Sequence, residues 1–542
     1  MFANYSGDFS IVRANSPIQL PKQLSDFPFV RFKEEKGVPV RPELEEYFPS
    51  MQSSPLLIAE KDSSCTEMSE MRIGVLFSGG PAPGGHNVLL GISDAISRIG
   101  SNGTLFGFQD GFKGLLEGKN IELTNGLLKD WANSGGFHLL STSRQKLKGN
   151  GDFEKVAQVC TRLELDGLVV IGGDDSNTNA GLLAEFFQKE KLKTSIVGVP
   201  KTIDGDLKGH SIEVSFGHDT AAKVISELVG NVCLDSLSCK KNYHFVRLMG
   251  RHASHLTLEA ALQVQPTYAL ISEQIKKEGI SIQRIVSSLV EIVKKRAAQG
   301  KHYGVILIPE GLIEQIPGID TLICVLNDLL ARDPNHTLET IHQSLDPASS
   351  IILGSLPKSI QVQLLYDRDA HGNVAVSRIE TERLLLSLVK QEVEKISQLR
   401  KTFSAIPHFF GYECRCAHPS LFDAHYCYSL GMCAAALVRE KRNGYMALMT
   451  GLEKDIYSWQ VRGVPLISMF QKERREGKWL PVIRKTLVDL NGPAFLMLKK
   501  NEELWSTQDC FLSPGPYQFE GERKVSHSIP RALFLEKQGC GD

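Results

Sequence analysis

The sequence has no surplus of either charge. Its 542 residues contain 61 lysines and arginines against 62 aspartates and glutamates, so the formal net charge is −1. Proteins that bind nucleic acid or an anionic membrane through a broad electrostatic field usually carry a clear basic excess. We therefore expect no nucleic-acid partner and no membrane partner. A highly charged ligand would have to be bound by a few placed side chains, by backbone amides or by a metal ion.

Cysteines are few, and no apolar signal segment follows Met1. The 11 cysteines are irregularly spaced, which favours a reducing, cytoplasmic setting over a disulfide framework. The longest uncharged stretch, residues 73–93, contains Pro81, Pro83 and six glycines. A lipid-spanning helix does not normally hold this combination, so the stretch predicts a strand, a turn and a helix of a soluble protein.

The composition is also not that of a disordered chain. Hydrophobic residues make up 42% and charged residues 23% of the sequence, close to the averages for folded soluble proteins. A chain of 542 residues is too long for one ordinary compact core. Length therefore predicts two or more lobes with extensions.

Short apolar runs recur after residue 71, and helical patterns follow them. The alternation predicts an α/β fold built on a parallel sheet. Before it, the proline-rich N-terminal residues predict an extension. A charge-rich segment within the second half of the sequence predicts a helical insertion. The C-terminal tail is basic and aromatic. The clearest strand candidates are residues 73–77, 168–171, 196–199, 305–308 and 446–449.

The first strand candidate is followed by a glycine-rich loop at residues 78–87, which reads SGGPAPGGHN. Glycines allow backbone N–H groups to approach an anion closely, and the start of the following helix adds a favourable dipole. The loop is neither a P-loop nor a dinucleotide fingerprint. Phosphate binding and a plain tight turn both remain open for this loop.

The second loop, residues 172–176, places Asp174 and Asp175 between a buried strand and a helix. In parallel sheets this is the edge where ligands bind. Adjacent carboxylates at that edge favour a cation, and Mg²⁺ held by one carboxylate, waters and phosphate oxygens is the natural occupant. The alternative is ordinary helix capping by Asp174 or Ser176.

The third loop, residues 200–206, combines Lys201, Thr202, Asp204 and Asp206 at the end of another strand. An aspartate there could accept a proton from a substrate hydroxyl, while the lysine neutralises charge on a transferring phosphoryl group. An Asp-Gly turn is the alternative for this loop alone. Three such loops on successive strand ends favour a shared site.

The second and third loops carry a resemblance to a known family. They read GGDDS and PKTIDGD, and the chain resembles the phosphofructokinase family, in particular its long pyrophosphate-dependent members. ATP-using members typically read GGDGS and PGTIDND at these places. The resemblance spans about residues 71–452, with the motifs at 249–251, 309–311 and 412–415 in family order.

The resemblance implies an α/β fold of two stacked lobes with mainly parallel sheets and an active site in the cleft between them. The segments expected are an N-terminal extension at 1–70, a donor- and Mg²⁺-binding lobe at 71–250, a sugar-phosphate lobe at 251–461 with a helical insertion at about 313–406, and a C-terminal extension at 462–542. The implied reaction is a glycolytic step. It is the reversible, Mg²⁺-dependent transfer of a phosphoryl group from pyrophosphate to the C1 hydroxyl of fructose 6-phosphate, which gives fructose 1,6-bisphosphate and phosphate.

The resemblance also implies roles for single residues. Gly80 would contact the diphosphate, Asp174 would hold Mg²⁺, and Asp204 would be the base, with Lys201 and Asp175 beside the reacting phosphates. A neighbouring subunit would supply residues at the positions of Lys241 and Asn242, which implies a homodimer or larger homo-oligomer. The residues implied for the sugar-phosphate pocket are Thr202, Ile203, Asp204, Lys241, Asn242, Met249, Gly250, Arg251, Glu310, Tyr412, Glu413, Cys414 and Arg415.

Asp175 and Lys201 separate this chain from ATP-using relatives. A carboxylate at 175 adds negative charge and bulk where a glycine would leave room, so a third phosphate would be repelled. Two alternatives stay open: an ATP-dependent 6-phosphofructokinase, and a non-catalytic regulatory subunit of the same family. The second would be expected to lack acids such as Asp174 or Asp204, and both are present.

Two other patterns are given less weight. The spacing of the cysteines and histidines between residues 414 and 427 does not match a zinc motif, and a buried helix over residues 422–437 is preferred. Acids interrupt the basic residues between 471 and 484, and this segment contains one tryptophan. They favour a solvated face or a subunit contact over a nucleic-acid patch.

Overall fold

The computed structural model describes residues 13, 16–39, 41–51, 53–62, 70–100, 102–209, 212–333, 336–368, 372–475, 478–516 and 529–539. Its internal contacts divide the chain into two compact units. The first is built chiefly from Met1–Ala221 and Glu413–Thr486, and the second from Ala222–Tyr412, Leu487–Tyr517 and Pro530–Asp542. The chain therefore enters each unit more than once. The segment boundaries expected at residues 70, 250 and 461 stay a prediction.

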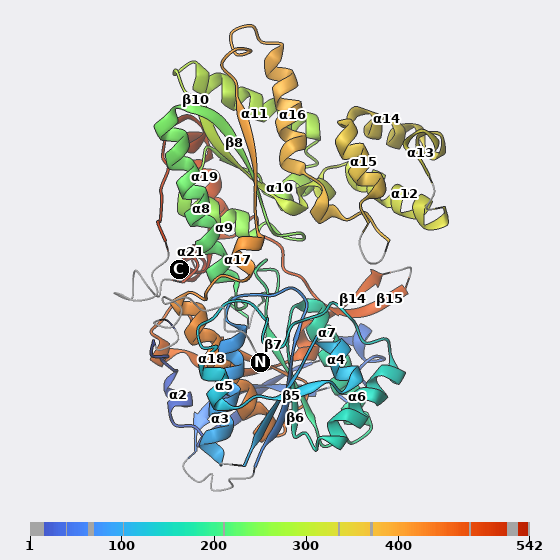
Figure 1. The fold of residues 1–542 in the computed structure, drawn as a ribbon, viewed down its shortest axis with the longest axis vertical. Helices are drawn as coiled ribbons and strands as arrows, with labels where there is room; N and C mark the ends of the chain where they lie inside the picture. Colours follow the sequence, from blue (N-terminus) through green and yellow to red (C-terminus); the bar gives the residue numbers. More distant parts are fainter. Residues whose placement is uncertain are drawn as a thin grey trace. The chain divides into compact units, whose positions relative to one another are not determined.

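The first unit contains a nine-stranded sheet whose middle is parallel. Strands β12, β7, β6, β3 and β4 run parallel to one another, and antiparallel strands extend both edges (Figure 1). The central strands are short and fully or largely buried, as the apolar runs predicted. In sheet order the strands are β1 (Val30–Pro39), β2 (Ser53–Lys61), β13 (Gln460–Pro465), β12 (Tyr445–Thr450), β7 (Ser195–Pro200), β6 (Gly167–Gly172), β3 (Arg72–Ser78), β4 (Thr104–Phe108) and β5 (Asn120–Glu122).

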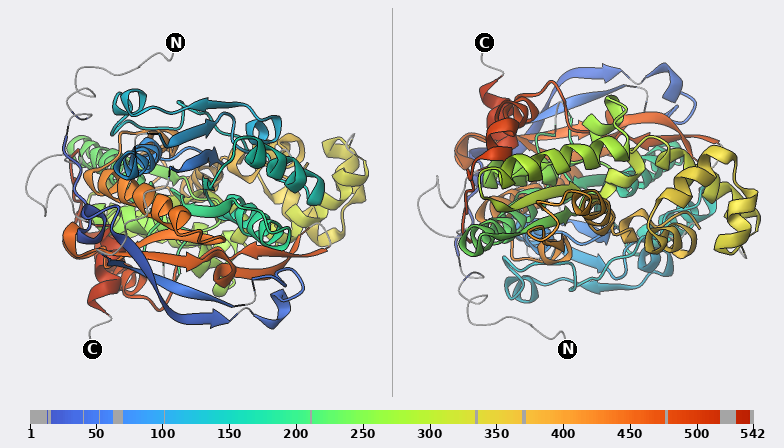
Figure 2. Two further views of the ribbon diagram at one scale, coloured as in Figure 1. Left: turned by 90° about the horizontal axis from the view of Figure 1, so that it is seen from below. Right: turned by 90° about the horizontal axis from the view of Figure 1, so that it is seen from above.

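Helices cover both faces of this sheet. One face carries α3 (Gly85–Ile99) and α18 (Leu421–Arg439), and the other carries α6 (Asn150–Arg162) and α7 (Asp174–Lys189) (Figures 1 and 2). Shorter helices in this unit are α2 (Lys22–Ser25), α4 (Phe112–Glu117) and α5 (Asn125–Lys129).

The helices α3 and α18 approach closely because each has a glycine at the crossing. A Cβ on Gly91 would lie 2.2 Å from the carbonyl oxygen of Tyr428, and a Cβ on Gly431 would lie 2.2 Å from that of Val88. Among the described residues, α18 is the one helix long and apolar enough to span a membrane by length and composition. The qualifying window is entirely buried, so α18 is packed as a core helix, as the preference for a buried helix at 422–437 predicted.

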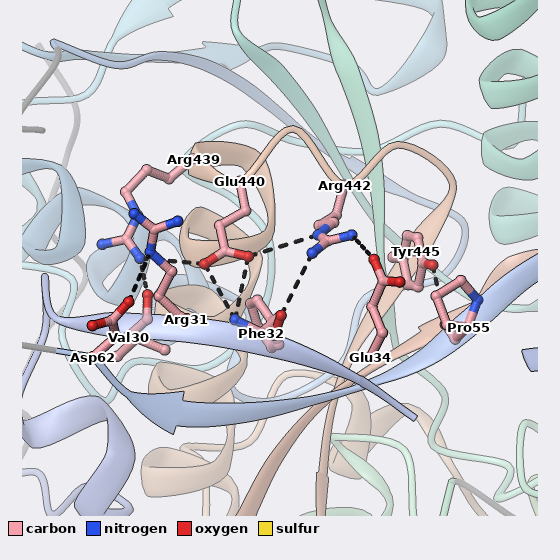
Figure 3. A network of polar contacts seen from close by, with 10 residues as sticks. All are labelled: Val30, Arg31, Phe32, Glu34, Pro55, Asp62, Arg439, Glu440, Arg442 and Tyr445. Atoms are coloured by element: carbon pink, nitrogen blue, oxygen red, sulfur yellow. Dashed lines mark hydrogen bonds and ion pairs between the residues drawn. The ribbon is translucent and has the colours of Figure 1, made fainter. Parts of the chain in front are cut away.

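The N-terminal segment adds the hairpin β1–β2 to one edge of the sheet (Figure 2). Polar contacts tie this hairpin to the end of α18 and the residues that follow it (Figure 3). The Glu440 carboxylate accepts a hydrogen bond from Phe32 N at 3.2 Å, and Arg442 pairs with Glu34 at 2.6 Å. The Tyr445 hydroxyl donates to the carbonyl of Pro55 at 3.0 Å. The first 61 residues thus contribute strands to the main sheet of this unit.

The second unit has a four-stranded, wholly parallel sheet. Its order is β11 (Ala405–Phe410), β8 (Lys241–Leu248), β10 (His302–Pro309) and β9 (Tyr268–Ala269). The helices that accompany it include α9 (His255–Val264), α10 (Ser272–Lys277), α11 (Ile282–Ala297) and α16 (Thr381–Glu394). Helix α8 (His218–Cys239) begins in the first unit and continues into the second.

The region expected to be a helical insertion is helical. After the 3₁₀ helix η2 (Glu310–Gln315) it contains α12 (Ile319–Arg332), α13 (Leu338–Ser344), α14 (Pro347–Ser355) and α15 (Lys358–Tyr366), and then α16. The C-terminal part forms the hairpin β14 (Phe470–Arg475) and β15 (Lys478–Ile483) in the first unit, and α19 (Pro493–Thr507) and α21 (Arg531–Gln538) in the second.

His86, in the first turn of α3, makes the stability of the protein depend on pH. It is completely buried, its Nδ1 lies 2.8 Å from Ser134 Oγ, and its Nε2 has no hydrogen-bond partner. Burial lowers the pKa of His86 from 6.5 to about 3, and the neighbouring His138 lowers it further. Between about pH 6.5 and 3, the His86 side chain therefore stays neutral in the folded state, whereas in the unfolded chain it binds a proton.

We expect this histidine to destabilise the protein as the pH falls below 6.5. The unfolded state binds one more proton than the folded state between pH 6.5 and 3, so stability is fully present above 6.5 and is lost toward 3. Between pH 6.5 and 5 the loss from this group is about 2 kcal/mol. Urea unfolding of the wild type and of His86→Phe at pH 7 and pH 5 measures it. Identical pH dependence in the two proteins would contradict the assignment.

Candidate active site

The three predicted loops leave one edge of the first unit's sheet side by side. In the parallel pairs, Ser78 at the end of β3 lies opposite Gly172 at the end of β6, and Gly172 lies opposite Pro200 at the end of β7. A hydrogen bond of 2.8 Å between Ser176 Oγ and Ser78 Oγ joins the first loop to the second. The structure thus brings the predicted donor residues together.

The first loop keeps open space beside two cations. Gly79 has φ +85°, in the left-handed region that favours glycine. A Cβ on Gly79 would lie 3.5 Å from Lys201 Nζ, and a Cβ on Gly80 would lie 2.8 Å from Arg415 Nη2. Side chains at these positions would fill the space in front of both cations, so the glycines fit an anion-binding loop that ends at the start of α3.

The second loop begins α7, with both aspartates in its first turn, where a helix favours negative charge. The residue before the helix is Gly173, and no side chain caps it. The alternative that Asp174 or Ser176 is simply a capping residue is therefore wrong. Asp175 Oδ2 lies 3.1 Å from Lys146 Nζ, an ion pair between two side chains that are each more than 40% exposed.

Asp174 has the features of a cation ligand. Its Oδ2 is shielded from solvent and has no hydrogen-bond partner, and Lys485 Nζ lies 3.5 Å away. Among the residues that the structure describes, no three His, Cys, Asp or Glu side chains gather into a complete metal site. The site fits Mg²⁺ in the way the sequence suggested, with one protein carboxylate and the remaining ligands from water and phosphate oxygens.

The third loop holds a buried cation among carboxylates. Burial lowers the pKa of Lys201 to about 8, and the charges of Asp204, Asp174 and Asp206 oppose that shift. Burial also raises the pKa of Asp206 to about 7, with Asp204 and Asp174 adding to the rise. Such opposed shifts are typical of a functional site in which charges have been gathered away from water.

Hydrogen bonds between the backbone of residues 203 and 204 and nearby side chains fix the loop that carries Asp204. Its N–H donates to Thr202 Oγ1 at 3.0 Å, and Thr202 Oγ1 in turn donates to Asp206 Oδ1 at 2.9 Å. His218 Nδ1 lies 2.9 Å from the carbonyl oxygen of Ile203. The Asp204 carboxylate is thereby carried on a fixed loop and is less buried than Asp206.

In the second unit, two predicted motifs meet at the ends of neighbouring strands. Residues 249–251 follow β8, and Glu310 follows β10. The buried Glu310 carboxylate accepts a hydrogen bond from Gly250 N at 3.0 Å, and Gly250 has φ +134°. A Cβ on Gly311 would lie only 1.9 Å from the carbonyl oxygen of Arg251. The structure therefore brings Met249, Gly250, Arg251 and Glu310 together.

The stretch 412–415 is divided between the units. Tyr412 belongs to the second unit and is 66% exposed, whereas Glu413, Cys414 and Arg415 belong to the first. Burial raises the pKa of the Cys414 thiol to about 12, so this sulfur stays protonated and is a poor nucleophile. Arg415 lies beside Gly80, among the donor loops.

Lys241 and Asn242 lie at the opposite end of β8 from residues 249–251. An eight-residue strand spans roughly 25 Å, so these two side chains are far from the motif that ends their own strand. The structure therefore does not bring Lys241 and Asn242 together with residues 249–251 of the same chain.

Three residues at the donor loops have no role predicted from the sequence. Asp206 lies in the predicted third loop, and the structure shows that it is buried and accepts a hydrogen bond from Thr202. Lys146 and Lys485 have no local motif, because folding alone brings them to Asp175 and Asp174. For Lys485 the one available signal was its place in the basic tail.

The model of a family described as Phosphofructokinase matches residues 72–438. The chain belongs to the phosphofructokinase family. It is 44% identical to the pyrophosphate--fructose 6-phosphate 1-phosphotransferase of Treponema pallidum, over 86% of this chain and 84% of that protein. It is 43% identical to subunit beta 2 of the enzyme of the same name from Arabidopsis thaliana, over 92% and 88% of the two chains. The resemblance read from the loops is thus confirmed.

Solved structures confirm the phosphofructokinase-like α/β fold. The pyrophosphate-dependent phosphofructokinase from Nitrosospira multiformis superposes with a TM-score of 0.54 at 15% identity, over 86% of this chain and 97% of that one. The corresponding protein from Marinobacter aquaeolei gives 0.53 at 16% identity, over 81% and 93%. At this level of identity the likeness concerns the fold alone.

Proposed function

We propose that this chain is a pyrophosphate-dependent phosphofructokinase. It transfers a phosphoryl group reversibly between pyrophosphate and the C1 oxygen of fructose 6-phosphate, with Mg²⁺, as a step of glycolysis. The observation that carries the proposal is that the loops with Asp175, Lys201 and Asp204 leave one edge of the sheet side by side, in a chain 44% identical to an enzyme named for this reaction.

The first unit would bind the donor. Backbone amides of the first loop and the start of α3 face an anion favourably, and Lys201 and Arg415 flank the space that Gly79 and Gly80 leave open. Asp174 would hold Mg²⁺, which when bound neutralises charge on phosphate oxygens. Because Lys201 is buried, its charge acts in a medium of low dielectric constant, where electrostatic stabilisation is strongest.

Asp204 would act as the general base in the forward direction. Its carboxylate takes the proton from the C1 hydroxyl while the C1 oxygen attacks the nearer phosphorus atom. The bond from that phosphorus to the bridging oxygen breaks, and inorganic phosphate leaves with the bridging oxygen. Direct in-line transfer needs no covalent enzyme intermediate, and in the reverse reaction Asp204 returns the proton to the C1 oxygen.

The second unit would bind the sugar phosphate through the loops after β8 and β10. Arg251 supplies a cation, and Glu310 holds the backbone of Gly250 in place. Thr202, Ile203 and the residues at 412–414 also belong to the predicted sugar-binding set. Residues equivalent to Lys241 and Asn242 from a second copy would reach the phosphate, so we infer a homodimer or larger homo-oligomer in the cytoplasm. Analytical ultracentrifugation tests the assembly.

A side-by-side assay tests the donor. Purified full-length protein is given fructose 6-phosphate and Mg²⁺ with either pyrophosphate or ATP, and fructose 1,6-bisphosphate is measured by a coupled assay. We expect turnover with pyrophosphate and at least a hundredfold lower kcat/KM with ATP. Preference for ATP would replace the proposal with an ATP-dependent enzyme, and folded protein inactive with both donors would replace it with a regulatory subunit.

A further inference from the structure

The C-terminal part of the chain is fixed against the donor loops at the end of β15. Ile483 N donates to Thr178 Oγ1 in α7 at 2.9 Å, and Arg484 N donates to the carbonyl of Met469 at 3.1 Å. Two residues later, Thr486 N donates to the carbonyl of Asp206 at 2.7 Å. The backbone on both sides of Lys485 is therefore held in place, and this fixes the position from which its side chain extends.

Lys485 extends from this segment to the predicted metal ligand. Its Nζ lies 3.5 Å from Asp174 Oδ2, and the two side chains are only 25% and 19% exposed. The carboxylate oxygen that it faces is shielded from solvent and accepts no hydrogen bond. A partly buried ammonium thus stands at the oxygen where a metal ion would bind, with no other acid paired to it among the described ion pairs.

The charges at the donor loops show what this lysine contributes. Lys485 faces two of the acids gathered there: it pairs with Asp174, and its charge lowers the pKa of Asp206, which burial, Asp204 and Asp174 raise. Without Lys485, Asp174 would lose the cation that pairs with it among the described ion pairs. Pyrophosphate would then meet more negative charge at this carboxylate, which weakens its binding.

We propose that Lys485 is a pyrophosphate-binding residue that the C-terminal extension supplies to the donor site. In the ligand-free protein its ammonium is the counter-ion of Asp174. With Asp174 engaged by a metal ion, the ammonium turns from that carboxylate to the phosphate oxygens and contacts the donor directly. The proposal rests on the proposed function, and it makes the segment after β15 part of the active site.

Calorimetric titration with magnesium pyrophosphate tests this role. We expect Lys485→Met to raise the dissociation constant at least tenfold, which corresponds to about 1.4 kcal/mol, while Lys485→Arg stays within about threefold of the wild type. The matched control is Lys472→Met in the β14–β15 hairpin that precedes Lys485. Lys472 pairs with Glu46 at 2.6 Å on the surface, so its loss should leave pyrophosphate binding unchanged.

Two further readouts separate ligand binding from a structural role. Titration with Mn²⁺ alone, followed by electron paramagnetic resonance, should show binding to Lys485→Met that is no weaker than to the wild type, because a competing cation has been removed from Asp174. Affinity for fructose 6-phosphate should also be unchanged. If Lys485→Met loses metal, sugar and donor binding together, the residue is structural and the proposal is wrong.

The outcomes distinguish this proposal from the proposed function. If the wild type binds pyrophosphate and Lys485→Met binds it equally well, only the role of Lys485 is refuted. If the wild type binds no pyrophosphate at all, the proposed function fails, and the role of Lys485 fails with it.

Discussion

Asp204→Asn lowers kcat for phosphoryl transfer by about a thousandfold, because the amide cannot accept the proton of the C1 hydroxyl. A positioned general base is worth roughly 10² to 10⁴ in rate, and a thousandfold corresponds to about 4 kcal/mol of transition-state stabilisation. The substitution keeps the shape of the side chain and the backbone bond from Asp204 N to Thr202 Oγ1. KM for fructose 6-phosphate should therefore change only a few-fold.

The reversibility of the reaction makes this prediction stricter. An enzyme variant cannot change the equilibrium constant, so the loss in catalytic efficiency must be the same in the two directions. Initial rates are measured with pyrophosphate and fructose 6-phosphate, and with phosphate and fructose 1,6-bisphosphate. Unequal losses in kcat taken alone would indicate that another step, such as product release, limits the wild-type enzyme in one direction.

Asp206→Asn is the matched control, since it makes the same chemical change two residues away. Asp206 is buried and accepts a hydrogen bond from Thr202 Oγ1, and burial raises its pKa to about 7. Its role in the structure is to support the loop, so we expect a loss of about tenfold. A larger loss of kcat for Asp206→Asn than for Asp204→Asn would indicate that Asp206, and not Asp204, is the general base.

The strands that the sequence predicted are those with uninterrupted apolar runs. The five runs correspond to β3, β6, β7, β10 and β12, each buried along most of its length. A strand covered by helices on both faces must be apolar at successive positions, which makes it visible without any partner. The donor loops could be predicted for the same reason, because each follows one of these strands.

Other strands mix polar and apolar residues, so no uninterrupted apolar run predicts them from the sequence. Strand β8 reads KNYHFVRL and includes His244, Arg247 and other polar residues, although it is largely buried. Strand β11 reads AIPHFF, is only partly buried, and falls at the end of a region predicted to be helical. The hairpin β1–β2 has a mixed charged sequence and joins the sheet only through β13. Some of their polar residues make contacts far along the sequence, such as Arg247 with Glu382 at 2.7 Å, which no local pattern reveals.

The same limit applies to the site. Residues 174, 201 and 204 lie on loops whose place is set by adjacent strands, so spacing along the chain was informative. Lys485 lies about 300 residues from its partner Asp174 in the sequence. Only the fold shows that a lysine beyond the family-matched residues 72–438 pairs with Asp174.

Asp175→Gly should change the preference between pyrophosphate and ATP by at least a hundredfold. At roughly 5 Å and an effective dielectric constant of about 20, a carboxylate repels a phosphate charge by about 3 kcal/mol. The ion pair with Lys146 at 3.1 Å offsets part of this, but both side chains are well exposed, where such pairs are weak. Removing the carboxylate opens space for a third phosphate and leaves Lys146 facing it.

We expect kcat/KM for pyrophosphate to fall about tenfold in Asp175→Gly and kcat/KM for ATP to rise about tenfold. Lys146→Met is the matched control, because it leaves the carboxylate in place without its counter-ion. That variant should lose activity with pyrophosphate and gain none with ATP, since the repulsion increases. If Asp175→Gly leaves the ratio of the two efficiencies unchanged, donor choice does not depend on the charge at position 175. Lys201 would then be the charged position that remains to be tested, because it also differs between these donor loops and those of ATP-using relatives.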